Sequence, residues 1–131
     1  MRQIERISIE TGWLKNDIVE KRCDEFGGIA SEMLLRIRLL AAMTEGYYVS
    51  HNKQLEDYLK AYDGENVREM IERAVELGYF SRKLYRASNI LTNKTMQYAY
   101  FFAKRMSKEV PVQRNWMLLN PEDYANVKII D

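Results

Sequence analysis

Runs of apolar residues at helical spacing, each followed by glycine, dominate the first part of this chain. Asn16 is suited to cap a short helix over residues 17–26, which Gly27 ends. The next run, over residues 29–44, has a wide apolar face and stops before Gly46. This pattern predicts a mainly helical protein whose short helices pack on one another.

Two further helices are expected close together. Asn52 is suited to begin the third, which ends before the turn at Asp63-Gly64. The fourth extends from Val67 to Gly78. Two helices joined by a tight turn that contains glycine are typical of a helix-turn-helix.

The stretch after the fourth helix contains two short apolar pieces separated by a basic turn. Residues 79–83 and 88–91 are predicted to pair as a β-hairpin, with Tyr85 near its tip. A hairpin in this position is a wing. The predicted fold class is therefore mainly α with a small β-hairpin (α+β), a winged helix-turn-helix.

A last helix is expected to begin at Thr92 or Asn93 and to extend to about Ser107. At about 100° per residue, seven residues fall on one of its faces. They are Lys94, Gln97, Tyr98, Phe101, Lys104, Arg105 and Lys108. The segment after Pro111 is apolar enough that we expect it to pack on other parts of a protein. We expect residues 1–108 to form the winged-helix domain and residues 109–131 to form a C-terminal tail or the start of a linker.

The composition and motifs exclude several classes of function. The chain has 131 residues, and no apolar run approaches the ~20 residues that cross a bilayer, so we expect a cytoplasmic protein without a membrane span. One cysteine and one histidine, His51, make too small a set for a zinc site, and His51 is expected at the surface or as a cap. There is no glycine-rich phosphate loop, histidine metal pattern or nucleophile elbow. We therefore expect no catalysis, no cofactor and no metal.

Charge is strongly segregated along the chain, although the net charge is only +1. Five acidic and two basic residues lie between Asp63 and Glu76, whereas seven basic and no acidic residues lie between Arg82 and Lys108. Clustered carboxylates on the fourth helix would repel the phosphates of a major groove. If the domain binds a duplex, the wing and the last helix are expected to supply the phosphate contacts. The candidate DNA-binding residues are Arg82, Lys83, Tyr85, Arg86, Lys94, Tyr98, Lys104, Arg105 and Lys108.

The basic block has two other interpretations. It is also compatible with a solvated surface, and the aromatic residues Tyr98 and Phe101 suit a subunit interface as well as nucleic acid.

Several landmarks resemble a known family. They are Asn16-Asp17-Ile18, Glu25-Phe26-Gly27, Gly46-Tyr47-Tyr48-Val49, Leu77-Gly78-Tyr79-Phe80 and Ile90-Leu91-Thr92, followed by the basic helix. In order and spacing they resemble the N-terminal winged-helix domain of phage-type replisome organisers and DnaD-like replication initiators, over Trp13 to about Lys108. The resemblance implies a winged helix that acts in replication initiation through DNA contact, self-association or both. It implies no catalytic residue.

Two hypotheses follow for the function. The first is a non-catalytic DNA-binding module associated with replication initiation in a phage or mobile element, with duplex DNA as its partner. The alternative is a protein-interaction module in which the acidic fourth helix and the tail around Trp116 form a homo-oligomer or recruit another replication protein. A transcription regulator with a ligand pocket ranks below both.

Overall fold

The helices begin where short polar side chains satisfy free backbone N–H groups. The computed structural model describes residues 6, 9–13, 16–44 and 46–131. Asn16 Oδ1 accepts hydrogen bonds from the first turn of α1 (Asp17–Phe26), and Gly27 ends that helix with a φ of 84°. A positive φ of this size is readily adopted only by glycine, which explains why the helix stops there.

The described residues form six α-helices and two small two-stranded sheets. After α1 the helices are α2 (Ile29–Met43), α3 (Lys53–Asp63), α4 (Val67–Glu76), α5 (Arg82–Ser88) and α6 (Lys94–Ala103). The strands are β1 (Val49–Ser50), β2 (Ile90–Leu91), β3 (Val110–Gln113) and β4 (Val127–Ile130), and residues 114–116 and 121–123 form 3-10 turns. The first four predicted helices are confirmed, with ends that differ from the expected ones by at most two residues.

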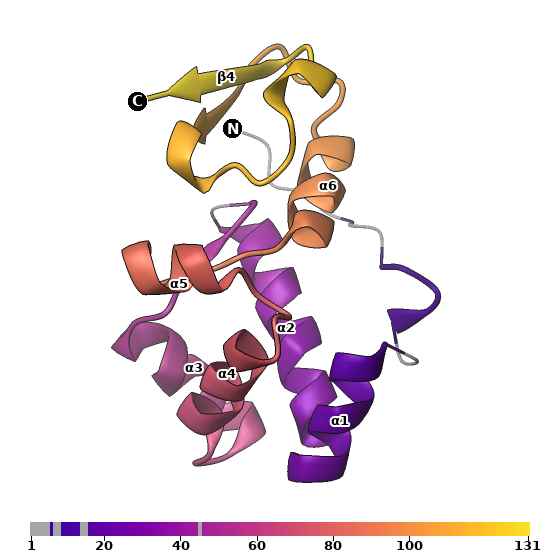
Figure 1. The fold of residues 1–131 in the computed structure, drawn as a ribbon, viewed down its shortest axis with the longest axis vertical. Helices are drawn as coiled ribbons and strands as arrows, with labels where there is room; N and C mark the ends of the chain where they lie inside the picture. The colour runs from indigo at the N-terminus through magenta and orange to yellow at the C-terminus, as the bar shows by residue number, and fades with distance from the viewer. Residues whose placement is uncertain (1–5, 7–8, 14–15, 45) are drawn as a thin grey trace.

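The first four helices surround the larger of two hydrophobic clusters. Figure 1 shows α1 to α4 gathered at one end of the molecule, with α6 leading away from them towards β4. Met33, Leu34 and Ile37 of α2 are fully buried against Leu59 of α3 and Ile71 of α4. The central position of α2 follows from its apolar residues, which extend around more of its surface than a single stripe.

One buried cation joins three of these helices. The guanidinium of Arg22, on α1, donates to Ala30 O of α2 at 3.1 Å and to Met70 O of α4 at 2.6 Å. No part of Arg22 is exposed to solvent. Burial lowers the pKa of this guanidinium to about 10, so it remains charged at neutral pH.

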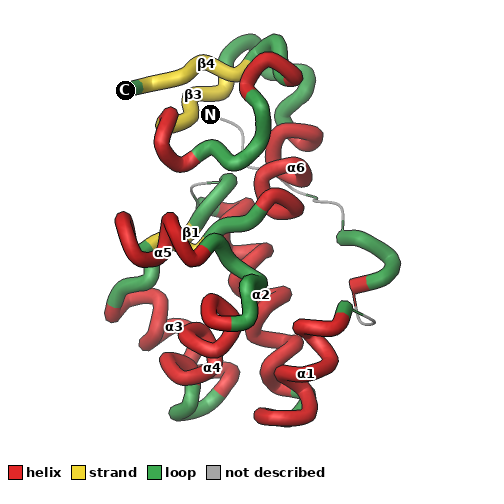
Figure 2. The backbone as a smooth tube through the Cα atoms, viewed as in Figure 1, coloured by secondary structure: helices red, strands yellow, loops and turns green. Residues whose placement is uncertain are grey.

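The expected wing is wrong: most of the predicted hairpin is the helix α5 (Figure 2). Ser81 Oγ accepts a hydrogen bond from Leu84 N and so caps a helix at a position that we expected inside a strand. Leu84 is buried in the core, and Asn89 ends the helix with a φ of 54°. A strand at 90–91 does form, but β2 pairs antiparallel with β1, in the register Val49↔Leu91.

Two hydrogen bonds join residues at the open end of the expected hairpin. Ser81 N donates to Thr92 O at 2.8 Å, and the Asn93 side chain donates to Tyr79 O at 2.9 Å. The two predicted strands thus approach each other only at their outer ends.

The C-terminal segment, residues 109–131, packs against α6, as the apolar tail predicted. β3 and β4 lie side by side in parallel, in the register Val110↔Val127 (Figure 2). Val110 and Val112 are buried with Tyr47 and Phe101 in the second hydrophobic cluster.

Gln97 holds the C-terminal segment onto α6. Its Nε2 donates to Trp116 O at 2.8 Å, and its Oε1 accepts from Leu118 N at 2.8 Å. The same Nε2 lies 3.2 Å from Thr92 Oγ1. Gln97 and Phe101 fall on the predicted face of the last helix but are buried, because the C-terminal segment covers that part of the face; Tyr98 on the same face stays exposed. The helix also ends at Ala103, earlier than the expected Ser107.

Gln97→Leu tests whether these hydrogen bonds hold the C-terminal segment in place. The change leaves the Trp116 carbonyl and the Leu118 N–H without their partner, so we expect the free energy of unfolding to fall by about 2–3 kcal/mol. Urea unfolding followed by circular dichroism measures it, with the exposed Gln54→Leu as the matched control. Equal urea midpoints of unfolding for the two variants would show that the hydrogen bonds of Gln97 do not stabilise the fold.

Candidate nucleic-acid interface

The arginines of the chain divide into those paired with carboxylates and those without such a partner. Arg68 Nε lies 3.1 Å from Glu56 Oε2, and Arg73 binds Glu25 through two nitrogens, with both Nε and Nη2 at 2.9 Å. Both arginines belong to α4. Because their charges are already neutralised, α4 presents mainly its exposed glutamates to solvent. The exposed glutamates of α4 are Glu69, Glu72 and Glu76, and Glu65 is exposed in the turn before the helix.

The three basic residues of α5 have a different environment. Arg82, Lys83 and Arg86 are exposed, and none of them forms an ion pair within the part of the chain that the structure describes. Arg82 donates through Nε and Nη2 to Glu76 O, at 3.2 and 3.0 Å, and so binds the carboxyl end of α4. A cation at the carboxyl end of a helix interacts favourably with the helix dipole. The outward-facing charges of α5 are available for an external anion.

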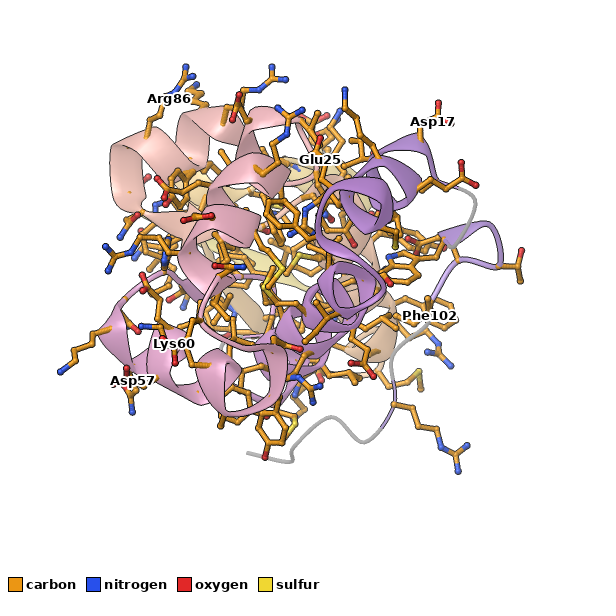
Figure 3. The ribbon with its side chains drawn as sticks, turned by 90° about the horizontal axis from the view of Figure 1, so that it is seen from below. Asp17, Glu25, Asp57, Lys60, Arg86 and Phe102 are labelled. Carbon is orange, nitrogen blue, oxygen red and sulfur yellow. The ribbon has the colours of Figure 1, made fainter. Side chains whose placement is uncertain are left out.

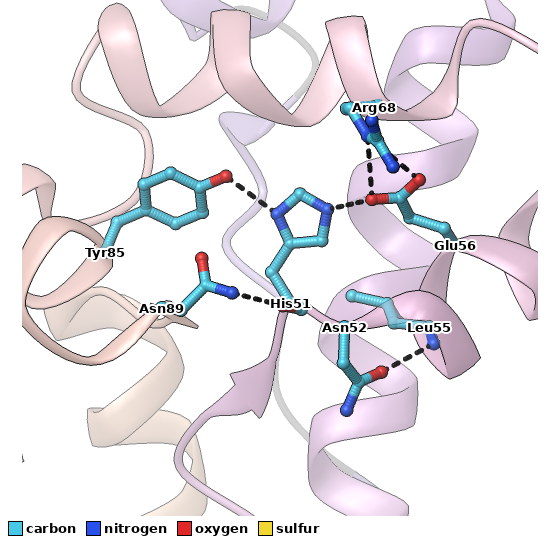
Figure 4. A network of polar contacts seen from close by, with 7 residues as sticks. All are labelled: His51, Asn52, Leu55, Glu56, Arg68, Tyr85 and Asn89. Carbon is cyan, nitrogen blue, oxygen red and sulfur yellow. Dashed lines mark hydrogen bonds and ion pairs between the residues drawn. The ribbon is translucent and has the colours of Figure 1, made fainter.

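Tyr85 lies in the helix α5, so the prediction that it lies at the tip of a wing is wrong. Its hydroxyl lies 2.8 Å from His51 Nδ1, and the two rings stack with centroids 5.7 Å apart (Figure 4). Burial raises the pKa of the Tyr85 hydroxyl. Tyr85 therefore fixes α5 to the segment before α3.

His51 is the centre of a buried polar network, whereas the sequence predicted a surface or capping residue. His51 Nε2 lies 2.7 Å from Glu56 Oε2, and Glu56 also accepts from Arg68 Nε (Figure 4). The side chains of His51 and Glu56 are both largely buried. Tyr85 and Glu56 are hydrogen-bonded to the two ring nitrogens of His51, so neither nitrogen is open to a substrate. The network therefore has a structural role.

The basic residues around α6 form a second group. Lys94 is exposed in the first turn, and Arg105 and Lys108 are exposed after the helix ends. Arg105 donates through Nη1 to Phe102 O at 2.8 Å, and its guanidinium carbon lies 4.1 Å from the centroid of the Phe102 ring. Lys104 is only half-buried, and its carbonyl accepts a hydrogen bond from Asn126.

The predicted site residues do not lie on a single face. Figure 3 places Arg86, on α5, at the upper left of the view and Phe102, on α6, at the right. Arg105 lies against Phe102, so it belongs to the second position. The structure therefore divides the predicted site into an α5 group (Arg82, Lys83, Arg86) and an α6 group (Lys94, Tyr98, Arg105, Lys108).

Two aromatic residues near the predicted residue Tyr98, namely Phe102 and Tyr124, were not singled out by the sequence. Phe102 is 44% exposed and lies beside Tyr98, which is 54% exposed. Tyr124 of the C-terminal segment packs on Phe101 with ring centroids 5.0 Å apart. The spacing of four residues between Tyr98 and Phe102 is a signal that could have identified the pair, because such residues are neighbours on a helix.

Comparison of the chain with protein-family models, with curated proteins and with solved structures gives no match. In the described residues no helix is long and apolar enough to span a bilayer. Over the same residues, no group of three or more histidine, cysteine, aspartate or glutamate side chains is placed to hold a metal ion.

The polar network predicts a specific pH dependence. The hydrogen bond from Arg68 lowers the pKa of Glu56, and His51 adds to this effect. The ionised carboxylate thus stabilises the fold above the ordinary pKa of glutamate, about 4.3, and this contribution is lost as the pH falls through the lower pKa of the folded state.

Glu56→Gln should therefore reduce the free energy of unfolding by about 2 kcal/mol at pH 7, since hydrogen bonds to a charged group are lost. Below about pH 4 the difference from the wild type should shrink. Urea unfolding at several pH values measures both effects, with Glu69→Gln on the exposed face of α4 as the control. A difference that stays constant with pH would show that the charge of Glu56 is not responsible.

Proposed function

We propose that this protein is a non-catalytic DNA-binding module of replication initiation in a phage or mobile element. The helix pair α3 and α4 serves as the helix-turn-helix, and α5 occupies the place of a wing. The observation that carries the proposal is the exposed cationic group of α5, whose three basic residues have no carboxylate partner among the described residues. The resemblance to replisome organisers and DnaD-like initiators supports the role in replication.

The acidic surface of α4 makes it unsuited to reading bases in a groove. The proposed contacts are therefore with phosphates, through other elements. Arg68 is paired with Glu56, and Arg73 is paired with Glu25 and Glu76. As a result, α4 would bring the carboxylates of Glu69 and Glu72, which are unpaired among the described residues, into a major groove. The cations of α5 are placed to bind the backbone of a duplex while α4 stays outside the groove. Such contacts position a protein on DNA without specifying a sequence.

A second candidate function is self-association, which a different surface supports. α2 and α3 pack on each other, and each leaves a pair of large apolar residues exposed one turn apart: Leu39 and Met43 on α2, and Tyr58 and Tyr62 on α3. Tyr58 also lines an open hollow of about 300 Å³, together with Leu40 and Val49. Apolar and aromatic residues around a hollow are typical of a subunit interface. The tail around Trp116 is less suited to this role, because Trp116 packs on Tyr48 within the chain.

Lys83→Ala combined with Arg86→Ala tests the α5 contact and leaves Arg82 in place at the end of α4. We expect weaker binding to a labelled duplex, and a log-log salt dependence whose slope falls by up to about 0.9 for each phosphate that the variant no longer neutralises. Fluorescence anisotropy at several salt concentrations measures both quantities. The control is Lys53→Ala with Lys60→Ala on α3, which changes the net charge equally. Equal affinity and slope in the two variants would remove α5 from the interface.

Leu39→Lys combined with Met43→Lys tests the apolar surface. If α2 and α3 form a subunit interface, the wild type should sediment as an oligomer at high protein concentration and the variant as a monomer. Both residues are half-exposed, so the fold should tolerate the changes. A wild type that stays monomeric over the whole concentration range would exclude self-association through this surface.

A further inference from the structure

An open hollow of about 270 Å³ lies between α6 and the segment at residues 121–126. Tyr98, Phe102 and Arg105 line it on the side of α6, and Asp123 and Tyr124 line it on the side of the C-terminal segment. Its volume is below the ~300–1,000 Å³ of most small-molecule sites, so it suits one small planar group.

The α6 side of the hollow is a stack of flat groups. The rings of Tyr98 and Phe102 are nearly parallel, with an interplanar angle of 22° and centroids 6.3 Å apart. The guanidinium of Arg105 lies 4.1 Å from the Phe102 centroid. Both rings are about half exposed, so their faces are accessible to a ligand.

The other side of the hollow supplies polar groups. Asp123 is exposed and forms no ion pair within the described part of the chain, so its carboxylate can accept a hydrogen bond from a ligand N–H. Burial raises the pKa of the Tyr124 hydroxyl, with smaller contributions from Asp123 and Tyr98, so this hydroxyl stays protonated at neutral pH. A ligand with a π face and an edge N–H would be complementary to both sides.

We propose that this hollow binds an unpaired base of a single-stranded nucleic acid. The base stacks on Tyr98 and Phe102, its edge N–H donates to Asp123, and Arg105 binds a neighbouring phosphate. A base in a duplex has both faces covered by its neighbours, so this site distinguishes single strands from the duplex that α5 is proposed to bind. The inference rests on the proposed function only in the class of ligand, because the two sites use different residues; Figure 3 shows Phe102 of the hollow and Arg86 of α5 on different sides of the view.

A similar aromatic pair elsewhere lacks the features that the proposal needs. Tyr58 and Tyr62 are exposed one turn apart on α3, and Arg36 lies 4.3 Å from the centroid of the Tyr62 ring. Their rings are tilted by 57°, however, and Arg36 is paired with Asp63 at 3.3 Å. The cation beside this pair is therefore already engaged by a carboxylate, unlike Arg105.

The test compares two labelled ligands with the full chain. One is an oligothymidylate, and the other is an oligomer of equal length made of abasic nucleotides, which has the same phosphates but no bases. Tyr98→Leu should weaken binding of the oligothymidylate by between about 5-fold and 150-fold, as expected for one stacked base, and should leave binding of the abasic oligomer unchanged. Tyr98→Phe, which keeps the ring, should bind both ligands like the wild type.

Three outcomes would overturn the proposal. The first is equal loss on both ligands, which would assign Tyr98 to folding or to phosphate contact. The second is an oligothymidylate affinity that Tyr98→Leu does not change. The third is no binding of either ligand by the wild type, which would leave the hollow to a protein partner. Duplex binding by the Lys83→Ala, Arg86→Ala variant reports on α5 separately, so failure of one site is distinguishable from failure of the other.

Discussion

The buried guanidinium of Arg22 fixes the arrangement on which the other surfaces depend. It hydrogen-bonds to carbonyls of α2 and α4, whereas its Nε has no partner among the described residues. Removing a charge from water is costly unless its hydrogen bonds are satisfied, so this position tolerates little displacement of the three helices. The orientation of α4 in turn determines where Arg82 meets Glu76 O and hence where α5 lies. A buried residue that belongs to neither proposed interface thus influences the geometry of one of them.

Helix positions were predictable from the sequence because their signals are local. Asn16, Asn52 and Asn93 each cap the helix that follows, and Gly27 and Gly64 take the positive φ values that end helices. The helix α5 was missed because seven residues show too little periodicity to distinguish helix from strand, and β-prone residues flank it on both sides. The burial of His51 was equally hidden, since its partner Tyr85 lies 34 positions away in the sequence.

The candidate interface was predictable in composition but not in shape. Charge segregation identified the exposed cations of α5 and α6, yet a linear count could not show that they lie on separate surfaces. Periodicity also placed Gln97 and Phe101 with the basic residues, because it marks which residues share a face and not what covers that face. The C-terminal segment covers the part of the face that holds these two residues, and their burial depends on that tertiary contact.

The hollow beside α6 has a thermodynamic consequence for the C-terminal segment. Its two sides come from parts of the chain that Gln97 holds together, so the hollow exists only while the segment is docked. By mass action, any ligand that binds only the docked form makes release of the segment harder by RT ln(1 + [L]/Kd), about 2.7 kcal/mol at a hundredfold excess over Kd. Occupancy of a surface site would in this way be transmitted to β3 and β4, and amide exchange in these strands would slow as the ligand concentration rises.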